Sequence, residues 1–225
     1  MVKLIVRSFV GLVFLVAVMA LALFLSAGSL GFWQAWAFLA AWTLSVVLIT
    51  AYLVRFDTKL LASRVQAGPV AETQKTQQVI QSIAGLLFIA LFIVPGLDYR
   101  FQWSAMPSVV SLVADGFVVL GFFIVFLVFK ENTYTSATIE VSESQKVIST
   151  GPYSVIRHPM YAGAGLLLLA VPFALGSWVS VPFPWPLIVV VAIRAIEEEK
   201  FLKANLSGYE AYRQKVRYRL IPGVW

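Results

Sequence analysis

The chain has 225 residues, of which 60% are hydrophobic and only 12% are charged, and its mean hydropathy is +0.86. A soluble domain carries about 25% charged residues, so this composition predicts an integral membrane protein and excludes an ordinary soluble domain. The sequence contains no cysteine and only one histidine. These counts exclude a disulfide framework, a thiolate nucleophile and any metal site built from several histidines or cysteines.

Four apolar runs predict membrane-spanning helices, because a spanning helix needs about 20 mostly apolar residues. They cover residues 4–27, 30–54, 80–95 and 109–129. A fifth apolar region, residues 161–196, is interrupted by Pro172, Gly176 and Pro182, which predicts two shorter helices joined by a proline-rich turn. The predicted fold class is all-α: a polytopic helical membrane protein with five to six transmembrane helices and a cytoplasmic C-terminal helix.

The basic residues gather on one predicted side of the membrane. With six spans, all of the 17 Lys and Arg residues except Arg100 fall on that side. By the positive-inside rule, both termini and this basic face are predicted to be cytoplasmic. Such a face attracts anionic lipid headgroups. Nucleic acid is not an expected partner, since the sequence shows no recognition module and no soluble basic domain.

Residues 130–160 are too polar to cross the membrane. Within them, residues 138–141 alternate apolar and polar side chains, which predicts extended backbone. The dipeptide Gly151-Pro152 is a turn signal. The segment is therefore expected to fold as an extended stretch and a turn before the next apolar helix.

An Arg-His pair stands at the end of this polar segment. Ionisable groups are costly beside a membrane, so a cluster of them there indicates chemistry at the interface. Pro159 suits the first position of a helix and disfavours helical backbone at His158. His158 is therefore predicted to lie just before a helix start, where free backbone N–H groups and the positive end of the helix dipole meet. Together with Arg157, these groups predict an anion site.

The motifs of residues 130–225, taken in order, resemble those of the isoprenylcysteine carboxyl methyltransferase family, which is related to the phospholipid N-methyltransferases. The resemblance is carried by Asn132, Gly151-Pro152-Tyr153, Arg157-His158-Pro159, Tyr161, Gly163, Glu198-Glu199, Tyr209, Tyr212 and Arg219-Leu220-Ile221-Pro222. It implies an integral membrane enzyme that uses S-adenosylmethionine. Residues 1–129 would then supply N-terminal transmembrane helices, and residues 130–225 the methyltransferase core of one integrated membrane domain.

The same resemblance implies roles for individual residues around a pocket that faces the cytoplasm. The implied cofactor-binding residues are Tyr153, Arg157, His158, Pro159, Tyr161, Gly163, Glu198, Glu199, Tyr212 and Arg219. Of these, Arg157, His158 and Glu198 are the expected catalytic residues, and Asn132 is expected to contact the acceptor. Because three glutamates stand in a row, Glu197 can replace Glu199 in the implied glutamate pair.

The chemistry of S-adenosylmethionine fits these residue types. An arginine, Arg157 or Arg219, suits its carboxylate. A glutamate suits its hydroxyl or amino groups, and tyrosine faces suit its sulfonium cation. An ionised carboxylate acceptor needs no base, whereas an amine or thiol needs one, for which His158 and Glu198 are the candidates.

Several alternatives stay open at this level. The acceptor can be a prenylated cysteine carboxylate, a phosphatidylethanolamine amine, or a small thiol or other hydrophobic molecule, and the oligomeric state is not predicted. A membrane reductase that uses NADPH on sterol-like lipids is a second function, although the sequence lacks Gly-x-Gly-x-x-Gly and an aspartate-rich C-terminal motif. A non-enzymatic scaffold or transporter is a third, although the charges avoid the predicted midplane, where transport sites lie.

Overall fold

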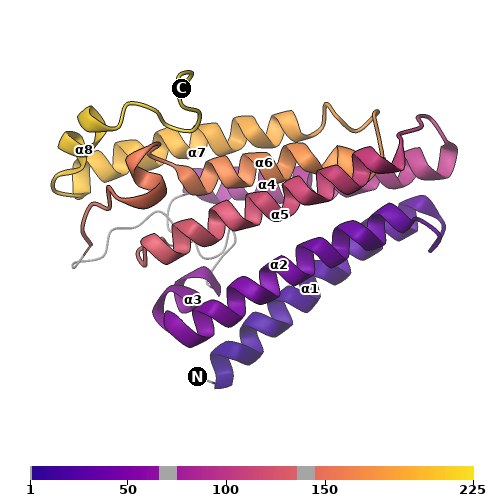
Figure 1. Cartoon of the computed structure of the whole chain (residues 1–225), viewed down its shortest axis with the longest axis horizontal. Coiled ribbons are helices and arrows are strands. Elements are labelled where there is room, and N and C mark those ends of the chain that lie inside the picture. The colour runs from indigo at the N-terminus through magenta and orange to yellow at the C-terminus, as the bar shows by residue number, and fades with distance from the viewer. Residues whose placement is uncertain (1, 66–74, 136–144) are drawn as a thin grey trace.

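The computed structural model describes residues 2–65, 75–135 and 145–225 (Figure 1). Within these residues the chain forms eight α-helices, one 3₁₀ turn and no strand. The chain is thus a polytopic helical membrane protein, as its composition predicts. The segment expected to be extended, residues 138–141, lies outside the described residues.

Six helices pack side by side and reverse direction one after another (Figure 1). They are α1 (Val2–Ala27), α2 (Trp33–Phe56), α4 (Lys75–Phe101), α5 (Ser108–Glu131), α6 (Pro159–Ala174) and α7 (Pro184–Asn205). Every predicted apolar run has become one of these helices, and residues 161–196 have split into α6 and α7 as expected. Four of the six, namely α1, α2, α4 from Ser82 onward, and α5, are long and apolar enough to cross a membrane. Helix α6 is shorter, with 16 residues.

Three short elements gather at one end of the bundle, which we call the α8 end. They are α3 (Thr58–Val65), the 3₁₀ turn η2 (Gly151–Ser154) and α8 (Tyr209–Lys215). The N-terminus lies at the same end, and the segment after α8 folds back along α7 (Figure 1). The reversals of the six helices place Arg100, at the C-terminal end of α4, at the opposite end.

Helices α5 and α6 make the most extensive contact between any two elements of the described chain. Two glycines allow this close approach. A Cβ atom on Gly163 would lie 3.0 Å from the Gly121 carbonyl oxygen, and one on Gly121 would lie 2.7 Å from the Leu167 side chain. Small residues commonly let helices approach in this way inside a membrane. The contact fixes the position of the N-terminal end of α6.

A hydrophobic cluster at the α8 end holds the short elements on the bundle. It joins Leu60 of α3, Phe129 of α5, Tyr153 of η2 and Tyr212 of α8. Burying these side chains is favourable at about 25 cal/mol per Å² of apolar surface. The cluster therefore gives the polar segments around it a fixed frame.

Candidate active site

The chain turns sharply before α6. Gly151 has φ +54°, a left-handed conformation that glycine adopts easily, and a Cβ there would lie 2.9 Å from the Glu131 side chain. The turn η2 follows, and α6 then begins at Pro159 with His158 as its N-cap residue. The predicted turn and the predicted place of His158 are both confirmed.

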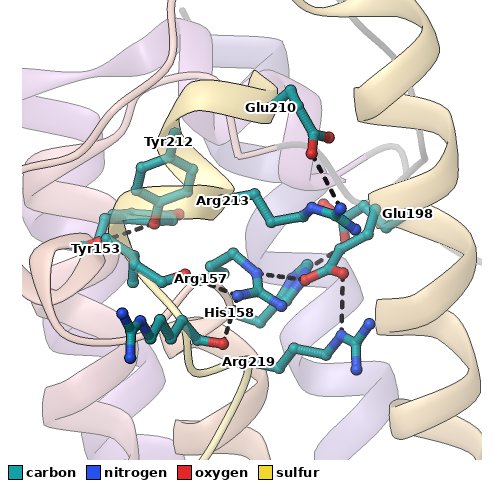
Figure 2. Close-up of polar contacts among 11 residues, drawn as sticks. Tyr153, Arg157, His158, Glu198, Glu210, Tyr212, Arg213 and Arg219 are labelled. Atoms are coloured by element: carbon teal, nitrogen blue, oxygen red, sulfur yellow. Dashed lines mark hydrogen bonds and ion pairs between the residues drawn. The ribbon is translucent and has the colours of Figure 1, made fainter. Parts of the chain in front are cut away.

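Arg157 is buried, with 7% of its surface exposed, and its guanidinium group donates three hydrogen bonds within the protein. Its Nε donates to Glu199 Oε1 at 2.6 Å. Its Nη1 donates to the carbonyl oxygens of Val216 and Arg217, both at 2.7 Å. A buried charge is tolerated only with such partners. Arg157 therefore joins α7 to the segment that follows α8 (Figure 2).

The segment of residues 216–225, which we call the tail, lies directly beside the Arg-His pair. The backbone N–H groups of Arg157 and His158 donate to the carbonyl oxygens of Tyr218 and Arg219, both at 2.9 Å. The Arg219 side chain contacts the same carboxylate as Arg157, and its Nε donates to Glu199 Oε2 at 3.0 Å. The tail is thus tied to the start of α6 by backbone and by side chain.

Glu199 is the centre of this ion-pair cluster. Burial alone raises its pKa, but contacts with His158, Arg157 and Arg219 outweigh burial and lower the pKa to about 2. The His158 Nε2 atom lies 3.3 Å from Glu199 Oε1. Glu199 is therefore ionised at neutral pH, and its negative charge is paired with Arg157 and Arg219.

Glu198 belongs to a separate contact group. The Tyr161 hydroxyl donates to Glu198 Oε2 at 2.7 Å, and Arg194 Nε donates to the Tyr161 hydroxyl at 3.2 Å. His158 stacks on the Tyr161 ring, with the two centroids 5.4 Å apart, and its Nδ1 is 3.8 Å from Glu198 Oε2. These contacts hold the Glu198 carboxylate in one orientation. Glu197, in contrast, pairs with Lys200 on the exposed face of α7.

A hollow opens between η2, the start of α6, α7 and α8. Its empty volume is about 800 Å³, including the space at its open mouth. Eight predicted site residues line it: Asn132, Tyr153, Arg157, His158, Pro159, Tyr161, Glu198 and Tyr212. Apolar lining comes from Val147, Ile148, Met160, Leu202 and Leu206. This mixture of a few polar groups on an apolar wall is typical of a small-molecule site.

Three tyrosines form one wall of the hollow. Asn132 Nδ2 donates to the Tyr153 hydroxyl at 3.0 Å, and the Tyr212 hydroxyl donates to the Tyr153 carbonyl oxygen at 2.8 Å. Burial raises the pKa of Tyr153, Tyr209 and Tyr212, so all three are neutral phenols at physiological pH. The buried Tyr209 hydroxyl has no hydrogen-bond partner among the described residues.

Three predicted cofactor-binding residues do not line the hollow. Glu199 and Arg219 lie in the ion-pair cluster beneath it, and Gly163 faces α5. Two residues without a predicted role stand at the site. Tyr209 carries the unpartnered hydroxyl, and Arg64 of α3 interacts electrostatically with Tyr161 and Glu198. The sequence could have indicated Tyr209, because this residue belongs to the C-terminal motif of the family resemblance. No feature of the sequence indicated Arg64.

One known family matches this part of the chain. The model of the phospholipid methyltransferase family matches residues 109–207. The match runs from the start of α5 to just past the end of α7, so it contains η2, the Arg-His pair and Glu198, and it leaves out α8 and the tail. No curated protein matches the chain significantly.

Proposed function

Because the model of the phospholipid methyltransferase family matches residues 109–207, we propose that this protein is an integral membrane enzyme that uses S-adenosylmethionine to methylate a lipophilic acceptor. The observation that carries the proposal is the convergence of His158, Glu198 and Tyr212 on one hollow at the α8 end. That end holds every lysine and arginine of the predicted topology except Arg100, so we place the active site in the cytoplasm.

The residues of the hollow fit S-adenosylmethionine. The oriented carboxylate of Glu198 suits the ribose hydroxyls or the ammonium group, and the unpartnered Tyr209 hydroxyl offers a further hydrogen bond. The faces of Tyr153 and Tyr212 suit a sulfonium cation. Arg157 lines the hollow, but its Nε and Nη1 are already occupied. We therefore assign Arg157, Glu199 and Arg219 to positioning His158 and the tail.

The site holds its polar groups in place before any ligand arrives. Tyr161, with Arg194 behind it, fixes Glu198, and the tail carbonyl oxygen of Arg219 fixes the backbone of His158. Side chains that are already oriented lose little entropy on binding, and orientation of the reacting groups supplies much of the rate of a displacement reaction. When bound, S-adenosylmethionine supplies an electrophilic methyl group.

The family description supports a phospholipid amine as the acceptor. A protonated amine must lose its proton before its nitrogen can take a methyl group. We assign this proton to His158, which lines the hollow and whose Nδ1 lies 3.8 Å from Glu198 Oε2. The apolar side chains of Met160 and Leu202, which line the same hollow, suit the apolar part of such an acceptor.

Calorimetric titration of the detergent-purified protein with S-adenosylhomocysteine and with NADPH tests the cofactor. We expect S-adenosylhomocysteine to bind and NADPH not to bind. Binding of NADPH alone would favour a reductase and contradict the proposal. Transfer of radiolabelled methyl groups in lipid nanodiscs then tests the acceptor. We expect label on phosphatidylethanolamine, and label only on an added prenylcysteine would reject the amine.

A further inference from the structure

A second cleft lies between Arg157, α8 and the tail, and it is strongly basic. Its empty volume is about 680 Å³, including its wide mouth, and its lining consists of Arg157, Arg213, Gln214, Arg217 and Arg219. No carboxylate belongs to this lining in the described part of the chain. Guanidinium groups bind phosphate oxygens through two parallel hydrogen bonds, so four arginines around one cleft favour an anionic phosphate ligand.

The charges around the cleft do not balance. Glu199 is shared by Arg157 and Arg219, and Glu210 is shared by Arg213 and Lys203. Two side-chain carboxylates thus face four arginines and a lysine in the surroundings of the cleft, and the Arg217 side chain is exposed. This excess of positive charge attracts an anion.

The tail carries exposed apolar side chains next to these arginines. Tyr218, Ile221 and Val224 are 39%, 55% and 76% exposed. The tail closes on itself, because the N–H groups of residues 219–221 all donate to one terminal oxygen of Trp225, and Arg219 lies over the Trp225 ring. Basic groups beside aromatic and aliphatic ones are typical of segments that lie in a membrane interface. The bundle of spanning helices places such an interface nearby.

We propose that the tail binds the headgroup phosphate of an anionic phospholipid in this cleft, with its apolar turn in the interfacial region of the membrane. The occupant is a membrane lipid and not a soluble phosphate, because two arginines of the cleft, Arg217 and Arg219, lie in the tail beside its exposed apolar side chains. The tail itself lies along α7 (Figure 1).

Lipid binding has a consequence for the hollow. The carbonyl oxygens of Val216, Arg217 and Tyr218 accept hydrogen bonds from Arg157, and that of Arg219 accepts one from the His158 N–H. A tail held by lipid therefore stabilises the Arg-His pair. This second step rests on the proposed function, whereas the lipid site itself does not.

Electron spin resonance of spin-labelled lipids tests the site with the full-length protein in phosphatidylcholine vesicles and no methyl donor. We expect wild type to prefer phosphatidylglycerol over phosphatidylcholine. The double variant R213Q/R217Q, which leaves the tail carbonyl groups in place, is expected to reduce that preference by about fivefold per removed charge. The matched control K59Q/K130Q removes two exposed lysines at the same end but outside the cleft, and it is expected to keep the preference.

Three results would overturn the proposal: no preference in wild type, an equal loss in the control variant, or displacement of the lipid by inorganic phosphate at physiological concentration. The coupling is tested by calorimetry in the same vesicles. S-adenosylhomocysteine should bind wild type more tightly when phosphatidylglycerol is present, and R213Q/R217Q should lose this gain. An equal gain in both proteins would reject the coupling. A protein that selects phosphatidylglycerol but binds no S-adenosylhomocysteine would contradict the proposed function and support the lipid site.

Discussion

Two adjacent glutamates on α7 have different environments. Glu199 is buried among Arg157, Arg219 and His158, whereas Glu198 lines the hollow and is held by Tyr161. Consecutive residues on a helix point about 100° apart, so one of them can stabilise the fold while the other faces a ligand. The glutamate pair of the family resemblance thus divides into a residue of the ion-pair cluster and a residue that lines the hollow, to which we assign ligand binding.

Replacing Glu198 by Gln should weaken binding of S-adenosylhomocysteine about tenfold or more, because a hydrogen bond to a charged group contributes about 1.5–3 kcal/mol. Glu197→Gln is the matched control, since Glu197 pairs with Lys200 outside the hollow. Titration calorimetry on both variants, with thermal melting to verify folding, measures the difference. Equal affinities in the two variants would remove Glu198 from the site.

The low pKa of Glu199 predicts how stability depends on pH. Its pKa is about 2 in the folded protein against an ordinary value of 4.5, so its ionised form stabilises the fold. This contribution is fully present above about pH 5 and is lost as the pH falls through the folded value of about 2. The Tm of wild type in detergent should therefore fall over this range relative to that of Glu199→Gln.

Glu199→Gln itself should be less stable at neutral pH, by about 3 kcal/mol, because it leaves the buried Arg157 without its carboxylate. The two melting curves are then compared from pH 7 downward. A difference in Tm that stays constant across the acidic range would show that Glu199 does not carry the expected charge.

At the residue scale the sequence predicts part of the site. The Arg157-His158 pair, its place before Pro159 and a glutamate partner on the last helix were all predictable. The register among three consecutive glutamates was not, because it depends on the rotation of α7. Arg64 was not predictable either, since only the packing of α3 on the bundle brings its charge to Glu198.

At the scale of elements, the glycine contact between α5 and α6 determines where the site stands. Hydropathy predicts that these helices exist, and prolines predict where the fifth apolar region breaks. Neither signal predicts which face of α6 meets α5, because an apolar helix in a membrane is hydrophobic on all sides. The small residues 162–165 were compatible with helix packing or with a cofactor, and Gly163 packs on α5.

The variant Gly163→Ala should destabilise the protein by about 1–3 kcal/mol, since its Cβ would lie 3.0 Å from the Gly121 carbonyl oxygen. Gly165→Ala on the same helix is the control. It meets no heavy atom within 4 Å, and alanine favours a helix over glycine. Thermal melting in detergent should show a lowered Tm for Gly163→Ala and not for Gly165→Ala. Unchanged melting of Gly163→Ala would show that the helices can separate at no cost.

For the whole molecule, the α8 end gathers the tail, the ion-pair cluster, the hollow and the basic cleft. The sequence predicts this polarity from charge alone, because the basic residues alternate with the spans. Length and hydropathy leave the number of crossings less defined, since α6 is short and α7 becomes polar from Arg194 onward. The α8 end is therefore the side that we assign to the cytoplasm.

The absence of native cysteines makes this assignment easy to test. Single variants Ser29→Cys, in the loop between α1 and α2, and Ser207→Cys, between α7 and α8, each place one exposed thiol at an opposite end of the bundle. In intact cells an impermeant maleimide should label the Ser29→Cys variant only. After the membrane is disrupted, it should label the Ser207→Cys variant as well. Labelling of Ser207→Cys from outside would invert the topology.

A structure of the protein determined with bound S-adenosylhomocysteine tests whether the hollow is the cofactor site. We expect the ligand in the hollow between η2, α7 and α8, with its polar groups on Glu198 and Tyr209 and the ion pair of Arg157 with Glu199 intact. A ligand bound elsewhere on the molecule, or one that breaks this ion pair to reach Arg157, would contradict this expectation.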